Sequence, residues 1–434
     1  MIARLRANEF VRHGSLVLGG VLLSNVFNYL YYMLIGRVVG VEAYGVVVAL
    51  VSTLLVVSAP ASVAQIVVAR IAADLESAAG RPALRRLARL ATERAAAFGI
   101  VLAILAALAR NPLNAYFHIS DPFAVVLTAV AIGLYAVTTV QRGVLQGAHR
   151  FGDFSASLTV ESGTKVAIGI ALALRFGADG ALAGLVLGIA LSLVYNAWTF
   201  RRVFGPPTAG MTLPRGLVSR VIAGVAAGQI TITILSFYDA PVIKHVFDAH
   251  AAGLYAAAAL VGRAVLSAII FVPTIIMPKA TARINAGLSP VPLLGAALAV
   301  AGGMVAAALA ITAVAPAFVV GTLAGHAFRD AAPLVMPYAL AAGLLSLANV
   351  TIAYKIGLHR YDFIVPVIAA ALVEIVTVCS WHPTALAVVY TLAAGHGLVF
   401  FATLWRITAN LAPAERAAPA EIEAPVTIAA EGVI

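Results

Sequence analysis

Cysteine is almost absent from this sequence, since Cys379 is the single one in 434 residues. The chain therefore forms no intrachain disulfide and no thiolate metal cluster. Charge is scarce as well, at 11% of residues, which is far less than the surface of a soluble domain of this length carries. Instead, 62% of the residues are hydrophobic and the mean hydropathy is +1.01. This composition excludes a soluble globular protein and predicts an all-α protein that crosses a membrane many times.

Long apolar runs between polar breaks number twelve, and we interpret each as one transmembrane helix. A run of about 20 apolar residues spans the hydrocarbon layer as a helix, which satisfies its own backbone polar groups. The third and eleventh runs are short. The predicted spans are residues 14–35, 43–69, 95–109, 123–145, 154–174, 181–200, 217–237, 253–277, 292–314, 334–356, 363–378 and 385–404.

Two short stretches recur with a nearly constant spacing. QGAHRFGDF, which contains Gly147, is echoed by IGLHRYDF, which contains Gly357, 210 positions later. VVGVEAYGVVVA, which contains Gly45, is echoed by VFDAHAAGLYAA, which contains Gly253, 208 positions later. Two matches with nearly the same spacing predict that the chain is duplicated.

The duplication predicts the domain organisation. Six spans, an even number, separate the two copies of the His-Arg motif, so both copies lie on the same face of the membrane. The repeats are then two parallel six-helix bundles related by an axis along the membrane normal, with a cleft between them. We expect an N-lobe at residues 1–203, a cytoplasmic linker at 204–216 that is rich in Pro and Gly, a C-lobe at 217–406, and a disordered cytoplasmic tail at 407–434.

The net charge of +10 and the pI near 9.9 have a simple origin in this topology. Of the 28 Lys and Arg residues, 21, including Arg142, fall on one side of the predicted spans and 5 on the other. Only Lys165 and Arg263 lie within spans. This positive-inside bias predicts a multi-pass protein of the cytoplasmic (inner) membrane with both termini in the cytoplasm. It explains the basic pI without a nucleic-acid partner.

The opening GSLVLGGVLLSNVFNYLYYMLIGRVVGVEAYG, the polar break near VARIAADLE and the LQGAHRF loop together resemble a known family. They are similar to the Wzx-type flippases, the polysaccharide and oligosaccharide exporters of the multidrug/oligosaccharidyl-lipid/polysaccharide (MOP) superfamily. The resemblance covers essentially the whole chain. It implies a MATE-like V of two bundles around a central cavity. It also implies alternating-access transport of an undecaprenyl-pyrophosphate-linked oligosaccharide for cell-surface polysaccharide biosynthesis.

The same resemblance implies the partners. They are the lipid-linked saccharide as substrate, membrane lipids, and other membrane proteins of polysaccharide assembly. No cofactor or metal is expected, apart from H⁺ or Na⁺ as a coupling ion.

Spans 1 and 7 carry matched polar stripes. Steps of three and four residues return to one helix face, and the two stripes are 208 positions apart, as the glycine echo is. Because these helices line the cavity in family members, the stripes are candidate sugar-binding walls; the alternative is hydrogen bonding between helices within each lobe. The stripes are Asn25, Asn28 and Tyr32 in span 1, and Gln229, Thr233 and Ser236 in span 7.

Arg263 lies in the middle of span 8. A guanidinium inside a membrane is costly unless it meets an anion, and its planar fork suits phosphate or carboxylate. It is the first candidate for binding the pyrophosphate or an acidic sugar. The alternative is an internal ion pair with Glu374 or Asp239.

Two carboxylates within spans are candidates for ion coupling by H⁺ or Na⁺. Glu161 in span 5 lies four residues from Lys165, so the alternative is a neutralised pair within the helix. Glu374 in span 11 has no cation close to it in the sequence. The arginines of the His-Arg motifs, Arg150 and Arg360, are candidates for a diphosphate contact, but we favour topology anchors at the interface.

Three functions are compatible with the sequence. The flippase is favoured. The alternative is a cation-coupled multidrug exporter of the same superfamily, although such exporters typically carry an acid in the first helix and run 14–35 has none. The third is a membrane glycosyl polymerase or ligase. Its only exterior cluster would be His326, Arg329 and Asp330 in a short segment, so we expect no enzyme.

Overall fold

A computed structural model describes residues 2–78, 80–119, 122–205 and 220–407. Throughout these ranges the regular structure is helical. The first bundle consists of α1 (Ile2–Val39), α2 (Val41–Val57), α3 (Ala59–Ala78), α4 (Gly80–Leu108), α5 (Arg110–Phe117), α6 (Phe123–Gly147) and α7 (Phe151–Phe204). The second consists of α8 (Arg220–Phe237), α9 (Asp239–Val246), α10 (Ala249–Ile269), α11 (Phe271–Asn285), α12 (Val291–Val314), α13 (Pro316–Leu323), the 3₁₀ helix η1 (His326–Ala331), α14 (Ala332–Gly357), α15 (Ile364–Ser380) and α16 (Ala385–Leu404).

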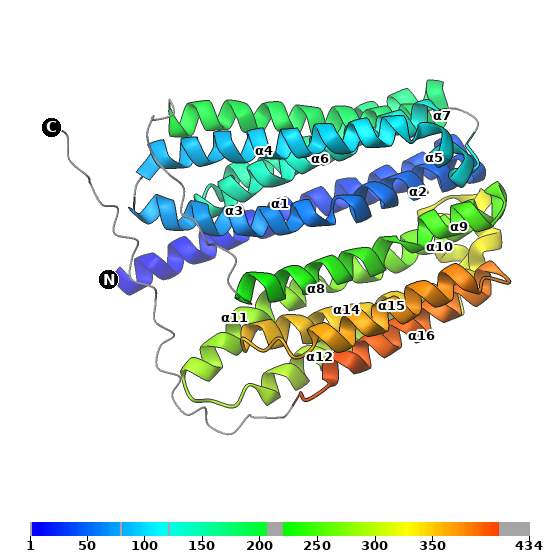
Figure 1. Ribbon diagram of the computed structural model, residues 1–434. Helices are drawn as coiled ribbons and strands as arrows, with labels where there is room; N and C mark the ends of the chain where they lie inside the picture. The colour runs from blue at the N-terminus through cyan, green and yellow to red at the C-terminus, as the bar shows by residue number, and fades with distance from the viewer. Residues whose placement is uncertain (1, 79, 120–121, 206–219, 408–434) are drawn as a thin grey trace.

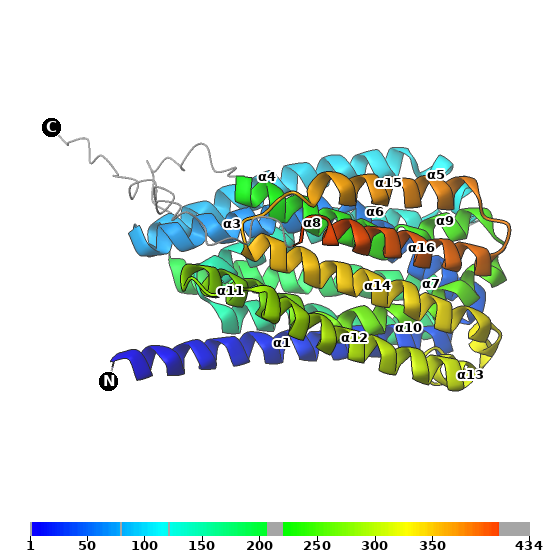
Figure 2. The same ribbon diagram turned by 90° about the horizontal axis from the view of Figure 1, so that it is seen from below.

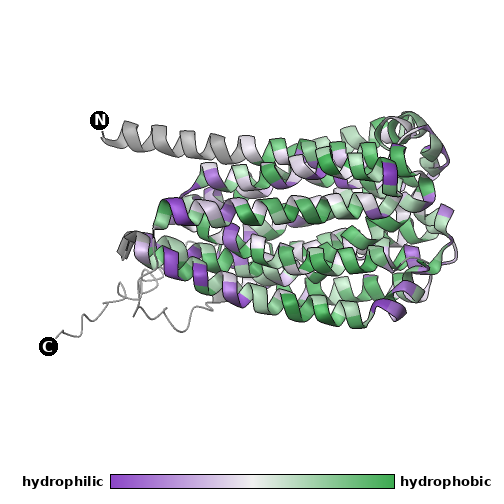
Figure 3. Cartoon of the chain, turned by 90° about the horizontal axis from the view of Figure 1, so that it is seen from above, coloured by the Kyte–Doolittle hydropathy of each residue, from purple (hydrophilic) through white to green (hydrophobic). Residues whose placement is uncertain are grey.

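The described part of every predicted span lies in one helix or in two consecutive helices, apart from single residues at breaks and ends, which confirms the all-α membrane fold. Eight helices are long and apolar enough to cross a membrane, and the bent pair α2 and α3 adds a ninth. Twelve are reached because the 54-residue α7 holds two spans that meet at Gly177, where φ is 58°, and because α1 and the shorter apolar α15 complete the set. Hydrophilic positions gather near the ends of the bundle (Figure 3).

The third span is longer than predicted. Residues 81–94, which precede the predicted third span, form the first turns of α4, whose apolar segment runs from Pro82 to Leu108. Leu84 and Leu87 are buried beside Phe200 at the end of α7. Arg85 and Arg86, which lie between them, are partly buried as well, so the basic start of α4 includes a packed face.

Figure 1 shows α1 to α7 in one bundle and α8 to α16 in the other, with the start of α1 and the end of α16 at the same end of the molecule. Seen from below in Figure 2, the start of α1 extends past the neighbouring helices. The predicted linker lies almost wholly outside the described residues, as does the predicted tail beyond residue 407.

The repeated His-Arg motif ends equivalent helices in the two bundles. After α6, the amide of Arg150 donates to the Leu145 carbonyl at 2.8 Å, and after α14 the amide of Arg360 donates to the Lys355 carbonyl at 2.9 Å. The intervening histidines have φ of 51° and 55°, the left-handed conformation that terminates a helix. The motif therefore ends α6 and α14 and reverses the chain into α7 and α15.

The repeated glycines mark where backbones touch. A Cβ at Gly147 would lie 2.0 Å from the Ala69 carbonyl oxygen in α3, and one at Gly357 would lie 2.4 Å from the Met277 carbonyl oxygen in α11. Two glycines 210 positions apart thus contact two residues 208 positions apart. The repeated glycines therefore mark the same helix-to-helix contact in the two halves of the chain.

The second glycine pair brings the two bundles together. A Cβ at Gly45 would lie 2.9 Å from the Gly253 amide nitrogen, and one at Gly253 would lie 2.0 Å from the Val41 carbonyl oxygen. The N-terminal turns of α2 and α10 therefore touch through their backbones. Since these residues are repeat equivalents, their contact lies on the pseudo-twofold axis.

Further contacts between the bundles lie at the end away from the start of α1, near the α5 and α9 labels of Figure 1. The Tyr116 and His245 rings stack at 3.9 Å, and the Nδ1 of His245 is 2.8 Å from the Tyr116 carbonyl oxygen. Arg37 donates to the Thr322 carbonyl at 2.5 Å. We call this group of contacts the distal seal.

Candidate functional site

A cavity of about 340 Å³ lies between the two bundles. The first bundle provides most of its wall, from α1, α2, α6 and α7, and the second provides part of α10 and the end of α8. The polar lining residues are Ser24, Asn25, Asn28, Tyr29, Tyr32, Tyr44, Tyr135, Arg142, Glu161, Lys165, Arg263 and Ser267.

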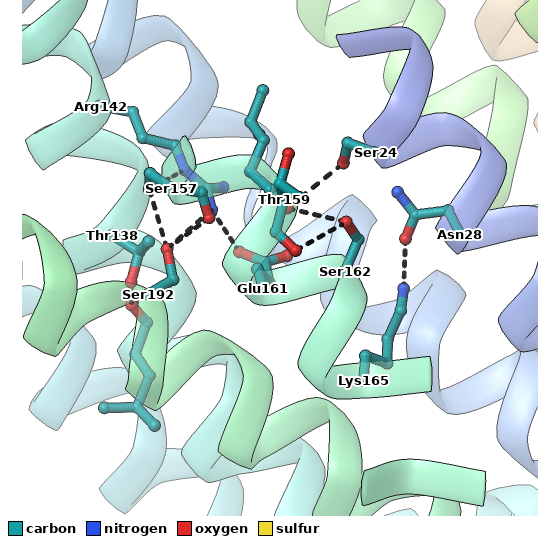
Figure 4. A network of polar contacts seen from close by, with 12 residues as sticks. Ser24, Asn28, Thr138, Arg142, Ser157, Thr159, Glu161, Ser162, Lys165 and Ser192 are labelled. Atoms are coloured by element: carbon teal, nitrogen blue, oxygen red, sulfur yellow. Dashed lines mark hydrogen bonds and ion pairs between the residues drawn. The ribbon is translucent and has the colours of Figure 1, made fainter. Parts of the chain in front are cut away.

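All three predicted residues of span 1, Asn25, Asn28 and Tyr32, line this cavity. Asn28 also accepts a hydrogen bond from the Lys165 ammonium, so it takes part in a contact within the lobe as well as in the cavity wall (Figure 4). The two interpretations of the stripe are therefore not exclusive at this position.

The stripe of span 7 lies elsewhere. Gln229 is exposed and donates to Thr233 at 3.4 Å, while Ser236 donates to a carbonyl of its own helix at 2.7 Å. None of the three lines the cavity, to which α8 contributes only Phe237. The structure does not bring the two stripes together, and a substrate role for the second remains a prediction.

Glu161 is paired, but with a different cation from the one the sequence indicated. Its Oε2 lies 2.7 Å from Nη2 of Arg142, which also contacts Ser157 and Ser192 at 3.0 Å (Figure 4). Arg142 was assigned to the cytoplasmic side, yet it is 4% exposed within α6. The spacing of Glu161 and Lys165 permits an internal pair, but the Arg142 guanidinium from a neighbouring helix donates to Glu161 instead.

Lys165 is thereby left without an anion. It is 5% exposed, and its ammonium lies on the Asn28 carbonyl and 4.7 Å from the centre of the Tyr31 ring. No carboxylate of the described chain comes within ion-pair distance of it. The cavity wall therefore carries a cation whose neighbours are an amide and aromatic faces.

Arg263 lines the cavity from the other bundle and has an internal partner. Its Nη2 lies 3.4 Å from Oδ1 of Asp239, and its guanidinium is 4.7 Å from the centre of the Phe237 ring. Asp239 also accepts from Tyr255 at 2.7 Å and from Tyr338 at 2.5 Å. Of the two partners considered from the sequence, the structure selects Asp239 over Glu374. A contact between Arg263 and substrate remains a prediction.

Glu374 lies outside the cavity, 2% exposed in the second bundle. It has a partner that the sequence did not reveal, because the Nε2 of His396 in α16 lies 3.3 Å from its Oε1. The Tyr238 hydroxyl donates to the same oxygen at 2.9 Å. In the sequence, the only indication of this partner is His396 itself, a single histidine within the apolar span 385–404.

The repeat counterpart of Glu374 is Lys165. One residue is missing from the second His-Arg loop, so Asp153 corresponds to Asp362 at a spacing of 209. The same spacing places Glu374 opposite Lys165. The two bundles thus carry opposite charges at one equivalent position.

The arginines of the His-Arg motifs have protein partners. Arg150 lies 2.7 Å from Asp153, and Arg360 lies 3.0 Å from Asp362 and donates to the Arg406 carbonyl at 2.6 Å. Beside Arg360, burial raises the pKa of the Tyr361 phenol. These contacts favour the anchor interpretation over diphosphate capture. Across the described residues, no group of three or more His, Cys, Asp or Glu side chains could hold a metal ion.

The sequence matches no family model and no curated protein. Solved structures do match. An inward-facing multidrug resistance MATE family transporter of the MOP superfamily has a TM-score of 0.74 at 14% identity, over 89% of this chain and 95% of that one. A MOP superfamily transporter from Pyrococcus furiosus, described by the reverse polarity of its binding pocket, has a TM-score of 0.58 at 15% identity, over 92% and 94%.

This chain has the MATE transporter fold. An outward-facing multidrug resistance MATE family transporter matches with a TM-score of 0.55 at 14% identity, over 92% of this chain and 94% of that one. At these identities the likeness establishes the architecture alone, so in this MATE-like fold the cavity residues must carry the argument about function.

Proposed function

We propose that the chain is a flippase that moves a lipid-linked oligosaccharide across the cytoplasmic membrane by alternating access. The lipid is undecaprenyl pyrophosphate, and the product serves cell-surface polysaccharide biosynthesis. The observation that carries this proposal is Lys165, a buried cation in the cavity wall without an anionic partner.

The charge of the cavity favours an anionic substrate. Arg142 and Glu161 neutralise each other at 2.7 Å, and Arg263 shares Asp239 with two tyrosines. Lys165 adds a further positive charge, with no carboxylate of the described residues within ion-pair distance. A buried charge is costly unless it meets its opposite, so phosphate oxygens entering the cavity would find a site that is already positive.

The size and composition of the cavity fit one end of an amphiphile. A volume of about 340 Å³ is at the lower end of the range for ligand pockets, so it holds a head group and not a whole lipid-linked saccharide. Apolar side chains face the polar stripe of α1, with Val48, Val51 and Leu54 from α2 and Leu260 from α10. The polyprenyl chain would remain in the bilayer.

The conformation fits the inner-leaflet stage of such a cycle. The distal seal closes one end of the molecule, and the TM-score is higher against the inward-facing transporter than against the outward-facing one. With both termini in the cytoplasm, as the positive-inside bias predicts, the seal lies on the outer side.

A cation-coupled multidrug exporter is the second candidate, because structures with this fold include multidrug resistance transporters. Its coupling carboxylates would be Glu374 and Glu161. Against it stands the lysine in the cavity, since a cationic drug would be repelled there.

A reconstituted assay separates the two candidates. Proteoliposomes are given a fluorescent lipid-linked oligosaccharide or a cationic dye, with and without H⁺ and Na⁺ gradients. We expect movement of the saccharide lipid and a loss of at least tenfold in Lys165→Gln. Arg175→Gln, which removes an exposed cation from the same helix, is the matched control and should retain full activity. Efflux of the dye alone would overturn the proposal in favour of the exporter.

A further inference from the structure

Glu374 and His396 form a closed buried pair in the second bundle. They come from α15 and α16, and they are 2% and 5% exposed. The side chains approach because Gly395 has none, since a Cβ there would lie 2.3 Å from Cγ of Glu374. The packing of the two helices thus leaves just enough room for the carboxylate.

The contacts of this pair favour a proton on one of its members. The Nδ1 of His396 is 2.9 Å from the Ala341 carbonyl oxygen, which only accepts, so Nδ1 carries a hydrogen. The Nε2 then faces Oε1 of Glu374 at 3.3 Å. If neither atom held a proton, two lone pairs would face each other beside a buried negative charge. One proton, on the imidazole or on the carboxyl group, resolves that conflict.

Among the described residues, the groups that act on the pair include no other cation. Tyr238 of α8 donates to the carboxylate at 2.9 Å, and Asp239 and Cys379 act on this site through their charge when ionised. The second carboxylate oxygen, Oε2, is buried with no hydrogen-bond partner among the described residues. The proton is therefore what neutralises the site, in contrast to the guanidinium that neutralises Glu161.

Three consecutive residues link this pair to the cavity. Phe237, Tyr238 and Asp239 lie at the break between α8 and α9. The Phe237 ring lies under the Arg263 guanidinium, Tyr238 binds Glu374, and Asp239 pairs with Arg263. A change of charge at Glu374 acts directly on Tyr238, whose neighbours on both sides hold the arginine of the cavity wall.

We propose that Glu374 and His396 share one transferable proton, and that its binding and release bias the position of Arg263 and thereby the transport cycle. The second half rests on the proposed function. The step moves one proton between the pair and water, and no other bond is made or broken. Release leaves a buried carboxylate held by Tyr238 alone, so the α8–α9 break must rearrange to satisfy it.

Infrared spectroscopy of the full-length protein in nanodiscs, titrated over the pH range in which it stays folded, tests the proton site without any substrate. We expect a pH-dependent carboxyl or imidazole band that is lost in Glu374→Gln and in His396→Gln. Glu161→Gln is the matched control, because it removes a partly buried carboxylate that is neutralised by arginine and should leave the band in place. Tyr238→Phe keeps both members of the pair and should retain the band while moving its midpoint.

A band that is absent from the wild type, or that survives in both Glu374→Gln and His396→Gln, overturns the shared proton. The link to transport is measured in proteoliposomes, where a pH gradient should stimulate lipid-linked saccharide movement by the wild type but not by Glu374→Gln. Stimulation that persists in this variant overturns the link. If the wild type moves no saccharide, the proposed function fails, and the infrared titration still decides the proton site.

Discussion

One position in the duplicated chain carries opposite charges in its two copies. Lys165 and Glu374 are repeat equivalents, yet the lysine lies on the cavity with aromatic neighbours and the glutamate lies on a histidine away from it. A charge within the membrane is costly unless polar or oppositely charged groups surround it, and these neighbours differ between the two copies. The first bundle thus places a cation in the cavity wall, while the second encloses an acid.

Arg142 should be required for the stability of the first bundle. Arg142→Ala leaves Glu161 as an unpaired charge in a largely buried position, which costs about 3 kcal/mol of unfolding free energy. Denaturant unfolding in detergent measures this loss. Replacing both partners by apolar residues, Arg142→Met with Glu161→Leu, should restore most of it. Arg89→Ala, which breaks an exposed pair with Glu93, should change stability by less than about 1 kcal/mol.

The proposed substrate contact of Arg263 is tested by measuring transport and folding together, because the same side chain pairs with the buried Asp239. We expect Arg263→Ala to abolish saccharide translocation while the protein remains folded in the membrane. Arg263→Lys keeps the charge but loses the planar fork, and should retain only part of the activity. The measurements are translocation in proteoliposomes and the thermal unfolding temperature. Full transport by Arg263→Ala would rule out the assignment of Arg263 to the substrate.

At the level of the helices, the repeat is preserved where backbones touch. Gly147 and Gly357 contact carbonyl groups of equivalent helices, and the histidines that follow have the same left-handed backbone. Function is not preserved in the same way, since the polar stripe of α1 lines the cavity and that of α8 does not. The two halves thus share their backbone contacts between helices, which we call the frame, but differ in the side chains that line the cavity.

The helix contact at Gly147 gives a test of this frame. Gly147→Ala places a methyl group 2.0 Å from the Ala69 carbonyl oxygen, so α3 and α6 must separate, at a cost of about 2 kcal/mol. Gly152→Ala is the matched control, because nothing lies within 4 Å of a Cβ at this helical position. The control should be neutral or stabilising by up to about 1 kcal/mol. The thermal unfolding temperature in detergent should therefore fall in Gly147→Ala and stay the same or rise in Gly152→Ala.

Local patterns in the sequence predicted the helices correctly but did not predict the ion-pair partners of the buried charges. An apolar run and a repeated glycine are properties of neighbouring residues, so the spans and the duplication could be recognised from the sequence. The neutralising partners of Glu161 and Glu374 come from other helices, Arg142 in α6 and His396 in α16, and no spacing along the chain indicates them. The missing residue in the second His-Arg loop changes the repeat spacing from 210 to 209, so the equivalence of Lys165 and Glu374 appears only when the loops are compared residue by residue.

For the whole molecule, the two bundles meet on their symmetry axis and at the distal seal. The axis contact between Gly45 and Gly253 needs no side chains, whereas the seal uses an aromatic stack and one guanidinium. A backbone contact on the axis tolerates rotation of one bundle against the other, while a few polar contacts can break and reform. This division suits a pivot with a gate beside it.

The pivot should be sensitive to a single methyl group. Gly253→Ala places a Cβ 2.0 Å from the Val41 carbonyl oxygen, so the first turns of α2 and α10 must move apart and the distal seal should open. Spin labels at the exposed positions Arg110 and His250, in a cysteine-free Cys379→Ser background, report the distance between the bundles at this end. We expect a longer and broader distance distribution than in the parent.

Gly295→Ala in α12 is the matched control, since nothing lies within 4 Å of a Cβ there, and it should leave the distribution unchanged. An unchanged distribution in Gly253→Ala would mean that the helices absorb the methyl group by bending, and the axis contact would then not set the position of the bundles. A shift in Gly253→Ala that is accompanied by lost transport and an intact unfolding temperature would instead identify this contact as the place about which the bundles turn.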